Sequence, residues 1–240
     1  MPVNHLMEEK PASYYAQERG DLVAQLPRPL GSVLDVGCGS GGAGRLLRAA
    51  GATRLTGVEL HAPSAQRARE LYDAVHVGRA EEIVPTLDEA FDTFVLYDLL
   101  EHLADPGGLL LELRRVAENG AHLHVSVPNA RHFSLLRDLA LRGTFGYAEW
   151  GHRDSTHLRW FTRGDLVALL EGSGWSVERV THGSLRPISR LAERVSRGLT
   201  AEFLVVQWAA LARAHRSGPG GPRSHGAAGS FTAGGAPRAR

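Results

Sequence analysis

Short apolar runs alternate with helix-periodic segments along most of this chain. Compact apolar runs are typical of buried strands, and apolar residues repeated every three or four positions are typical of amphipathic helices. The alternation predicts an α/β fold with a doubly wound, mostly parallel sheet. The strand-like runs are Val33–Val36, Leu55–Val58, Val75–Val77, Phe94–Tyr97, His122–Val127 and Trp175–Val180, and the helical segments are 42–50, 63–72, 106–117, 133–141 and 163–171.

The two ends of the chain extend this pattern. Residues 11–26 predict a leading helix that begins at a proline, and we expect it to close over the ligand site. Residues 188–199 predict another helix, and residues 205–213 a seventh strand, although the alanines there favour a helix as much as a strand. Residues 216–240 contain mostly Gly, Pro, Ser, Ala and Arg, so we expect a folded domain at 1–215 followed by a disordered tail.

One connection is too long for a simple turn. Residues 128–162 follow the fifth predicted strand, and long loops inside a compact domain tend to be functional. Because ligands bind at the carboxyl edge of open α/β sheets, we expect this insertion to form a lid over a small ligand. The alternative is that its aromatic side chains only pack the insertion on the sheet. The candidate ligand-binding residues are His132, Tyr147, Trp150, His152 and Arg159.

A glycine-rich turn follows the first strand. Asp35 precedes three alternating glycines, and the next predicted strand ends in Glu59. Glycines let bare backbone approach a ligand, and an acid at the tip of the neighbouring strand can accept both ribose hydroxyls, so the pair predicts a nucleoside-cofactor site. Gly37, Gly39 and Gly42 also satisfy the dinucleotide pattern G-x-G-x-x-G, but the Asp35 carboxylate suits an ammonium group and would repel a diphosphate.

Composition narrows the class of protein. At 240 residues, with 43% apolar and 22% charged residues, the chain can bury one full core. A single cysteine excludes a disulfide framework, and no run reaches the roughly 18 apolar residues of a membrane span. We therefore expect a soluble, cytoplasmic protein with no membrane partner. The tail contains four arginines and no acids, which leaves residues 1–215 with a formal charge of −3 and argues against a nucleic-acid partner.

The stretch Asp-Val-Gly-Cys-Gly-Ser-Gly at residues 35–41 resembles the first motif of class I S-adenosylmethionine-dependent methyltransferases. Residues 57–59 resemble their ribose-binding motif, and residues 91–96 and 99–106 resemble their fourth strand and the segment after it. The resemblance implies a seven-stranded, Rossmann-like methyltransferase fold and S-adenosylmethionine as the cofactor. Carried over position by position, it implies cofactor binding by Asp35, Gly37, Cys38, Gly39, Glu59, Leu60, Ala80, Glu81 and Asp98.

One segment departs from that family pattern. After the third strand the family usually has Gly-Asp-Ala, with the aspartate accepting the adenine amino group, whereas this chain has Gly78-Arg79-Ala80-Glu81. An arginine cannot accept a hydrogen bond. Glu81, backbone groups or packing alone must therefore hold the adenine, and these alternatives stay open.

Two further stretches indicate a subgroup. Residues 128–132 and 156–162 resemble bacterial methyltransferases related to the ubiquinone-pathway O-methyltransferases and, more loosely, the methionine-biosynthesis protein that partners homoserine acyltransferase. The first resemblance implies O-methylation of a small-molecule acceptor, such as a phenol, a sugar or a secondary metabolite. The alternative is a binding or assembly partner of a biosynthetic enzyme with little or no catalysis, and a nicotinamide oxidoreductase ranks third. A homodimer and a complex with a biosynthetic enzyme both stay open.

Methyl transfer to a hydroxyl requires removal of a proton, and histidine suits this task because its pKa lies near neutrality. His102 and His157 are the first candidates as catalytic bases. Asp98, Glu101 and His102 are spaced i, i+3, i+4, so a helical turn would place them on one face. This spacing resembles the E-x-x-E-H site of metal-assisted relatives. The hypothesis is that these three residues and His157 hold Mg²⁺ or Mn²⁺, and the alternative is a metal-free site.

Overall fold

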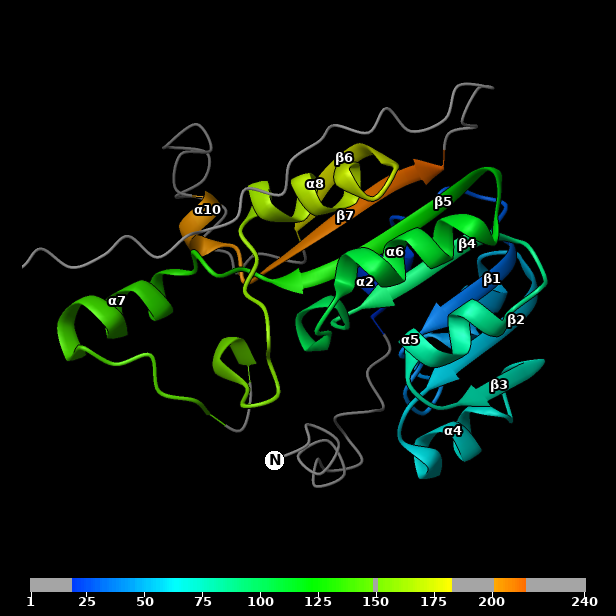
Figure 1. The fold of residues 1–240 in the computed structure, drawn as a ribbon, viewed down its shortest axis with the longest axis horizontal. Coiled ribbons are helices and arrows are strands. Elements are labelled where there is room, and N and C mark those ends of the chain that lie inside the picture. Colours follow the sequence, from blue (N-terminus) through cyan, green and yellow to red (C-terminus); the bar gives the residue numbers. More distant parts are fainter. Residues whose placement is uncertain (1–18, 149–150, 183–200, 215–240) are drawn as a thin grey trace, which may run out of the picture.

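The computed structural model describes residues 19–148, 151–182 and 201–214, which form one seven-stranded sheet flanked by helices (Figure 1). The order across the sheet is β3-β2-β1-β4-β5-β7-β6, and β7 alone runs antiparallel to the other six strands. The expected doubly wound, mostly parallel fold is confirmed. The strands are β1 (Gly31–Val36), β2 (Ala52–Glu59), β3 (Ala74–Val77), β4 (Phe91–Tyr97), β5 (Ala117–Pro128), β6 (Trp175–His182) and β7 (Gln207–Ala214).

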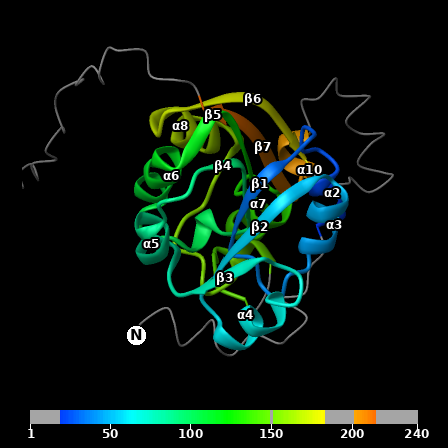
Figure 2. The same cartoon turned by 90° about the vertical axis from the view of Figure 1, so that its right-hand side faces the viewer.

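Helices cover both faces of the sheet. Figure 2 shows α5 (Ala80–Ile83), α6 (Pro106–Arg115) and α8 (Arg163–Gly172) on one face, with α2 (Gly20–Val23) and α3 (Gly44–Ala49) on the other. Within the described residues, no helix is long and apolar enough to cross a bilayer. The other helices are α4 (Ala62–Ala68), α7 (Phe133–Arg142), α10 (Ala201–Leu204) and the 3₁₀ turns η2 (Val84–Thr86), η3 (Leu100–His102) and η4 (Gly151–Arg153).

Side chains at the helix starts explain where two of these helices begin. The Asp105 carboxylate accepts the Gly108 N–H at 2.9 Å and caps α6. Thr162 and Asp165 form a reciprocal capping box at the start of α8, in which each side chain accepts the other residue's N–H. Such caps satisfy amide donors that have no partner inside the helix.

Buried aromatic residues hold the α6 and α8 layer to the sheet. The Phe94 ring packs edge to face against Trp175, with 5.6 Å between ring centroids. The Trp175 indole N–H donates to the Leu110 carbonyl at 3.0 Å, which ties the edge strand β6 to α6. A second cluster, which includes Leu47 and Leu55, packs α3 on the opposite face. With both faces covered, the carboxyl edge of the sheet is where polar side chains can gather.

The ends of the chain differ in part from the sequence prediction. The seventh strand exists, and it is inserted between β5 and β6, where both faces are covered and its alanines are buried. The alanines of this segment favour a helix as much as a strand, so packing against β5 and β6 decides that it forms a strand. Helix α6 ends at Arg115, before the predicted end at position 117, because the Phe91 N–H donates to the Val116 carbonyl. Residues 11–18, 188–199 and 216–240 lie outside the described residues.

Candidate cofactor and acceptor site

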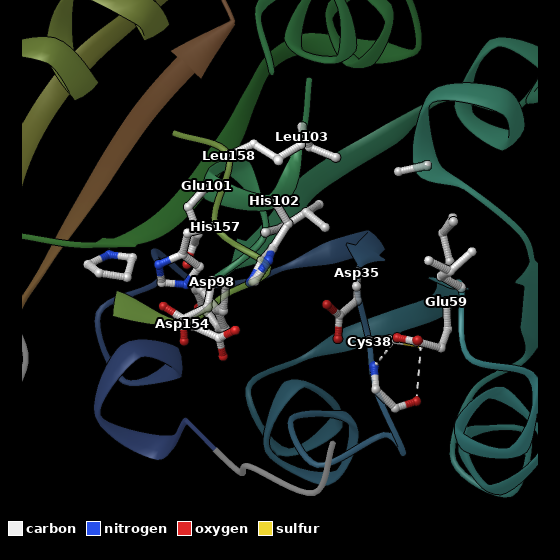
Figure 3. A pocket seen from close by; sticks show the side chains of 18 of the residues that line it. Asp35, Cys38, Glu59, Asp98, Glu101, His102, Leu103, Asp154, His157 and Leu158 are labelled. Atoms are coloured by element: carbon white, nitrogen blue, oxygen red, sulfur yellow. Dashed lines mark hydrogen bonds between the residues drawn. The ribbon is translucent and has the colours of Figure 1, made fainter. Parts of the chain in front are cut away.

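A cavity of about 680 Å³ opens at the carboxyl edge of the sheet (Figure 3). This volume lies within the range of about 300–1,000 Å³ that is typical of small-molecule sites. The walls come from the segments that follow β1, β2, β3 and β4 and from the insertion between β5 and α8. Because the parallel strands all end at this edge, residues far apart in the chain meet there.

The glycine-rich turn after β1 forms one wall of the cavity. Gly37, Gly39 and Gly41 have φ angles of 81°, 56° and 83°, a region that side chains with a Cβ rarely adopt. The N–H groups of Gly37 and Cys38 donate to the Val58 carbonyl at 2.8 and 3.2 Å, which fixes the turn to β2. The turn therefore presents a rigid stretch of bare backbone to the cavity.

Glu59 ends β2 and holds this turn in place. Its Oε2 accepts the Gly39 N–H at 2.8 Å and its Oε1 accepts the His61 N–H at 2.7 Å. Burial raises the pKa of the Glu59 carboxyl, and the two amide hydrogen bonds lower it by less. Each carboxylate oxygen has a second lone pair. The side chain can thus accept hydroxyl groups of a ligand and keep both amides bound.

Asp35 is buried near the end of β1 and lines the cavity. The Tyr72 hydroxyl donates to its Oδ2 at 2.6 Å. Burial raises the pKa of Asp35 to about 7, the Tyr72 hydrogen bond lowers it, and the neighbouring Glu59 charge raises it. A cation at this position would favour the ionised carboxylate. The site therefore suits a ligand that carries an ammonium group.

Cys38 lines the same wall, but it is not a reactive thiolate. A Cβ on Gly57 would come within 2.7 Å of its Sγ, so the thiol packs directly on the β2 backbone. Burial is the largest cause that raises the pKa of this thiol far above its usual range, and the Asp35 and Glu59 charges add to it. Cys38 therefore stays neutral and contributes packing.

The wall after β3 holds Arg79, at the position where the family pattern has an aspartate. Its Nη2 lies 3.0 Å from Oε1 of Glu81, and its Nε lies 3.8 Å from Oε1 of Glu82. Leu60 and Ala80 line the cavity beside this ion pair. The acceptor group on this wall is thus the Glu81 carboxylate, which Arg79 holds in place.

Asp98 follows β4 in a left-handed conformation, with φ of 51°, which is uncommon for a residue other than glycine. Its carboxylate accepts hydrogen bonds from the Arg19 guanidinium and the Gln207 amide. Its N–H lies 3.2 Å from Ser126 Oγ. Asp98 is therefore fixed on the cavity wall by the start of α2, by β5 and by β7.

Glu101, His102 and His157 meet at the end of the cavity away from Glu59 (Figure 3). One ligand atom from each residue lies within 4.8 Å of the others. The two imidazole rings pack edge to face, with 4.8 Å between their centroids. The 3₁₀ turn η3 supplies the first two residues and the insertion supplies the third. Asp98, which the sequence placed in this cluster, is not among its members.

The Glu101 side chain is 1% exposed, and neither of its carboxylate oxygens has a hydrogen-bond partner. Burial raises the pKa of this carboxyl to about 8. Its main-chain carbonyl accepts the N–H groups of Leu158 and Arg159 at 2.8 and 3.0 Å, so the insertion is fixed against η3. A buried carboxyl without a partner is costly, and such groups cluster at functional sites.

Backbone carbonyls orient both histidines of the cluster. His102 Nδ1 lies 3.2 Å from the Thr156 carbonyl, and His157 Nδ1 lies 3.3 Å from the His152 carbonyl. Because a carbonyl oxygen only accepts, we assign the proton to Nδ1 in both rings, and Nε2 then carries the lone pair. This arrangement is typical of histidines that bind a metal or take up a proton at Nε2.

His152 and His132 form a stacked pair in the insertion. His152 lines the cavity, and its Nε2 lies 2.8 Å from the Val206 carbonyl. His132 stacks on it with 4.7 Å between ring centroids, and burial together with the neighbouring His152 lowers the pKa of His132 to about 4. His132 does not line the cavity. It supports His152 from behind.

Tyr147 and Arg159, also predicted as ligand-binding residues, lie outside the cavity wall. Tyr147 is 61% exposed and packs against Trp160, and the Arg159 guanidinium donates to the Ala104 carbonyl. Both side chains lie on the outer surface of the insertion. The sequence pattern of aromatic and polar residues does not show which of them face the cavity. Trp150 lies outside the described residues.

Sequence patterns missed several cavity residues. Asp154 is buried, and its Oδ1 accepts the N–H and hydroxyl of Thr156 at 3.0 and 2.8 Å. Gln207 begins β7, and because β7 runs antiparallel its first residue lies at the carboxyl edge of the parallel strands. An antiparallel orientation assigned to the predicted seventh strand would have placed Gln207 at the cavity. Arg19 and Tyr97 also line the cavity, and no local motif marks them.

Comparison with known proteins agrees with this geometry. A family model described as a methyltransferase domain matches residues 6–180. A protein of Mycolicibacterium smegmatis named "Probable S-adenosylmethionine-dependent methyltransferase" is 31% identical over 157 residues, which cover 63% of this chain and 56% of the relative. A ubiquinone biosynthesis O-methyltransferase of Pseudomonas syringae pv. tomato is 32% identical over 121 residues, or 48% of this chain and 49% of the relative. The chain thus spans about half the length of these curated relatives.

A solved structure from Thermotoga maritima, described as a "SAM-dependent methyltransferase, possible histamine N-methyltransferase", superposes with a TM-score of 0.63 at 19% identity. The match covers 88% of this chain and 99% of that protein. At this identity the likeness shows the shared fold. The family match spans the turn after β1, Glu59 and the η3 cluster, and the cavity carries the acids that a nucleoside with an ammonium group requires. The chain therefore belongs to the class I S-adenosylmethionine-dependent methyltransferases.

Proposed function

We propose that this chain transfers the methyl group of S-adenosylmethionine to a hydroxyl oxygen of a small molecule. The observation that supports the choice of oxygen is the buried cluster of Glu101, His102 and His157 at the end of the cavity away from Glu59. A hydroxyl holds its proton at neutral pH, so transfer to oxygen needs a base or a cation, whereas a neutral amine needs neither. Relatives named as ubiquinone biosynthesis O-methyltransferases support the same choice.

The carboxylates on the cavity wall support one orientation of the cofactor. Asp35 takes the ammonium group of the methionine moiety, with Asp98 at the same end. Glu59 accepts the two ribose hydroxyls, because its oxygens retain lone pairs beyond the two amides that they bind. Glu81 accepts the adenine amino group, with Arg79 as the positioning residue. The backbone of Gly37 and Gly39 and the side chains of Cys38, Leu60 and Ala80 provide packing.

The remaining work of the protein is to align the acceptor and to remove its proton. S-adenosylmethionine supplies a methyl group already activated by the sulfonium. The chain holds the acceptor hydroxyl in line and excludes water, which is the role of the insertion as a lid. In a metal-free site, His102 or His157 accepts the proton at Nε2, since backbone carbonyls hold Nδ1 in both rings.

The same three side chains fit a divalent cation. Both oxygens of the buried Glu101 carboxylate lack hydrogen-bond partners, and two imidazoles lie beside it, which gives a mixed oxygen and nitrogen donor set. Such a set suits Mn²⁺ better than Mg²⁺, which prefers oxygen ligands. Bound there, the cation would lower the pKa of the acceptor hydroxyl. The protein ligands would be three, since the Asp98 carboxylate is held by Arg19 and Gln207.

The test follows labelled methyl groups from S-adenosylmethionine to a panel of phenols, sugars and amines. We expect label on hydroxyl acceptors, loss of transfer in EDTA, and better recovery with Mn²⁺ than with Mg²⁺. Glu101→Gln should lower transfer on the order of 100-fold while the affinity for S-adenosylhomocysteine stays the same. Glu171→Gln, at an exposed position on α8, is the matched control.

Each part of the proposal has its own contrary result. Transfer to amines alone would contradict O-methylation. Full activity in EDTA together with an inactive His157→Gln variant would support a histidine base and contradict a role for a cation. Full activity of Glu101→Gln would remove the cluster from the reaction.

A further inference from the structure

Exposed apolar side chains concentrate on the insertion after β5. Helix α7 exposes Phe133, Leu136, Leu139 and Leu141 by 48%, 39%, 51% and 78%. The first three are spaced i, i+3, i+6 and therefore form one stripe along the helix. Figure 1 shows α7 projecting away from the sheet. Large apolar side chains in such a group are unusual on a surface that contacts only water.

A group of aromatic residues follows this helix along the chain. Phe145 and Trp160 pack edge to face with 5.5 Å between ring centroids, and Tyr147 lies 6.4 Å from Trp160. All three are exposed, by 38%, 36% and 61%. Leu158, two residues before Trp160, lines the cavity. We call Phe133, Leu136 and Leu139 together with these three aromatic residues the α7 surface. The insertion thus carries cavity residues on its inside and apolar residues on its outside.

The charge around the α7 surface is positive. Residues 131–163 contain six arginines and three acids, Asp138, Glu149 and Asp154. Both aspartates are buried, and the arginines of this stretch exceed its acids by three charges. One carboxylate serves three guanidinium groups, since Asp138 pairs with Arg137, Arg142 and Arg153 at 2.9, 3.5 and 3.4 Å. The insertion therefore has an excess of positive charge, although residues 1–215 as a whole have a formal charge of −3.

We propose that the α7 surface docks on the headgroups of an anionic lipid bilayer, with α7 lying in the plane of the interface. Leucine and phenylalanine side chains enter the boundary of the acyl region, tyrosine and tryptophan sit at headgroup level, and the arginines contact anionic headgroups. Docking of this kind needs no spanning helix. The expectation of no membrane partner rested on the absence of a spanning run, which does not bear on docking through a surface.

Charge separates a bilayer from a second copy of this chain. A two-fold dimer through the α7 surface would bring the same arginines together, and like charges repel. An anionic bilayer matches the arginines, the aromatic residues and the apolar stripe at once. Docked in this way, the acceptor end of the cavity lies behind Leu158 on the membrane side. A lipophilic acceptor could then reach Glu101, His102 and His157 from the bilayer.

The test is co-sedimentation of the full chain with vesicles of phosphatidylcholine alone and of phosphatidylcholine mixed with phosphatidylglycerol. We expect binding to the mixed vesicles, weakened by salt. The double variant Leu136→Glu with Leu139→Glu, both on the stripe, should lower the partition coefficient at least about tenfold, and Arg142→Gln about fivefold. Leu111→Glu, at a position 56% exposed on α6, is the matched control and should leave binding unchanged.

Calorimetric titration with S-adenosylhomocysteine measures the cofactor affinity of each variant separately from its vesicle binding. The surface variants leave the cofactor wall intact, so the membrane proposal can fail while the proposed function stands. Unchanged cofactor affinity with lost vesicle binding supports the α7 surface. The proposal is overturned if the wild type ignores mixed vesicles, if Leu111→Glu causes an equal loss, or if the double variant still binds. A dimer that the double variant dissociates, without vesicle binding, would assign the surface to a second copy.

Discussion

Replacing Glu59 by glutamine tests how the cofactor ribose is held. In the wild type both carboxylate oxygens accept backbone amides, Oε2 from Gly39 and Oε1 from His61. Glutamine has nearly the same shape, but one of its two terminal groups is an N–H donor. That group cannot accept the amide that faces it or a ribose hydroxyl. The substitution therefore removes the charge and half of the acceptors while the side-chain volume stays nearly constant.

The size of the effect follows from the hydrogen bonds to Glu59. A hydrogen bond to a charged group contributes about 1.5–3 kcal/mol, and a neutral one about 0.5–1.5 kcal/mol. Loss of one ribose contact and weakening of the other should cost about 1–3 kcal/mol of binding free energy. This corresponds to a rise in Kd of about 5- to 150-fold at 25 °C.

The assay is calorimetric titration with S-adenosylhomocysteine and with its 2′-deoxy analogue. For the wild type, the analogue should bind more weakly than the parent compound. For Glu59→Gln, the difference between the two compounds should shrink, because the group that reads the 2′-hydroxyl has changed. Glu70→Gln, at an exposed position beyond α4, should leave both affinities unchanged. Thermal melting separates a binding defect from a loosened turn.

Equal affinities of wild type and Glu59→Gln for S-adenosylhomocysteine would refute the assignment of Glu59 to the ribose. An equal loss for the parent compound and the 2′-deoxy analogue would mean that the substitution acts only through the shape of the turn at Gly39.

Four more predictions come from the described contacts. Tyr72→Phe removes the donor to the buried Asp35 and should lower the free energy of unfolding by about 1–3 kcal/mol in chemical denaturation. Burial raises the pKa of Asp35 from 3.8 to about 7. The protonated carboxyl therefore stabilises the fold fully below pH 3.8, and this stabilisation is lost as the pH rises through 7. Asp35→Asn should flatten this part of a plot of Tm against pH. The wild type should bind S-adenosylhomocysteine more tightly as pH rises through 7, whereas Asp35→Asn should bind weakly with no such rise. Thr162→Ala removes half of the α8 capping box and should cost about 1 kcal/mol, which thermal melting would detect beside Thr53→Ala, a control at an exposed position.

Local spacing predicted the part of the site that is built within short segments. The glycines after β1 fix a backbone shape without help from distant residues, and Glu59 ends the adjacent strand, so both line the cavity as expected. Glu101 and His102 are neighbours in one turn for the same reason. In each case the geometry follows from φ angles, strand direction or helical spacing.

The rest of the site depends on packing between distant segments. Asp98 was expected to join the metal cluster by its spacing, but Arg19 and Gln207 hold its carboxylate instead. His132 was expected to bind a ligand and stacks behind His152. Both outcomes were decided by side chains from other elements of the fold, and one sequence contains no local signal for such contacts.

The placement of β7 has a consequence for how the catalytic fold is assembled. Among the described strands, β7 lies between β5 and β6, so the edge strand β6 pairs only with residues 207–214. The same strand brings Gln207 to Asp98. Pairings of such wide sequence separation form slowly. During synthesis, the chain should therefore become able to bind cofactor late, when β7 pairs with β5 and β6 and completes the sheet.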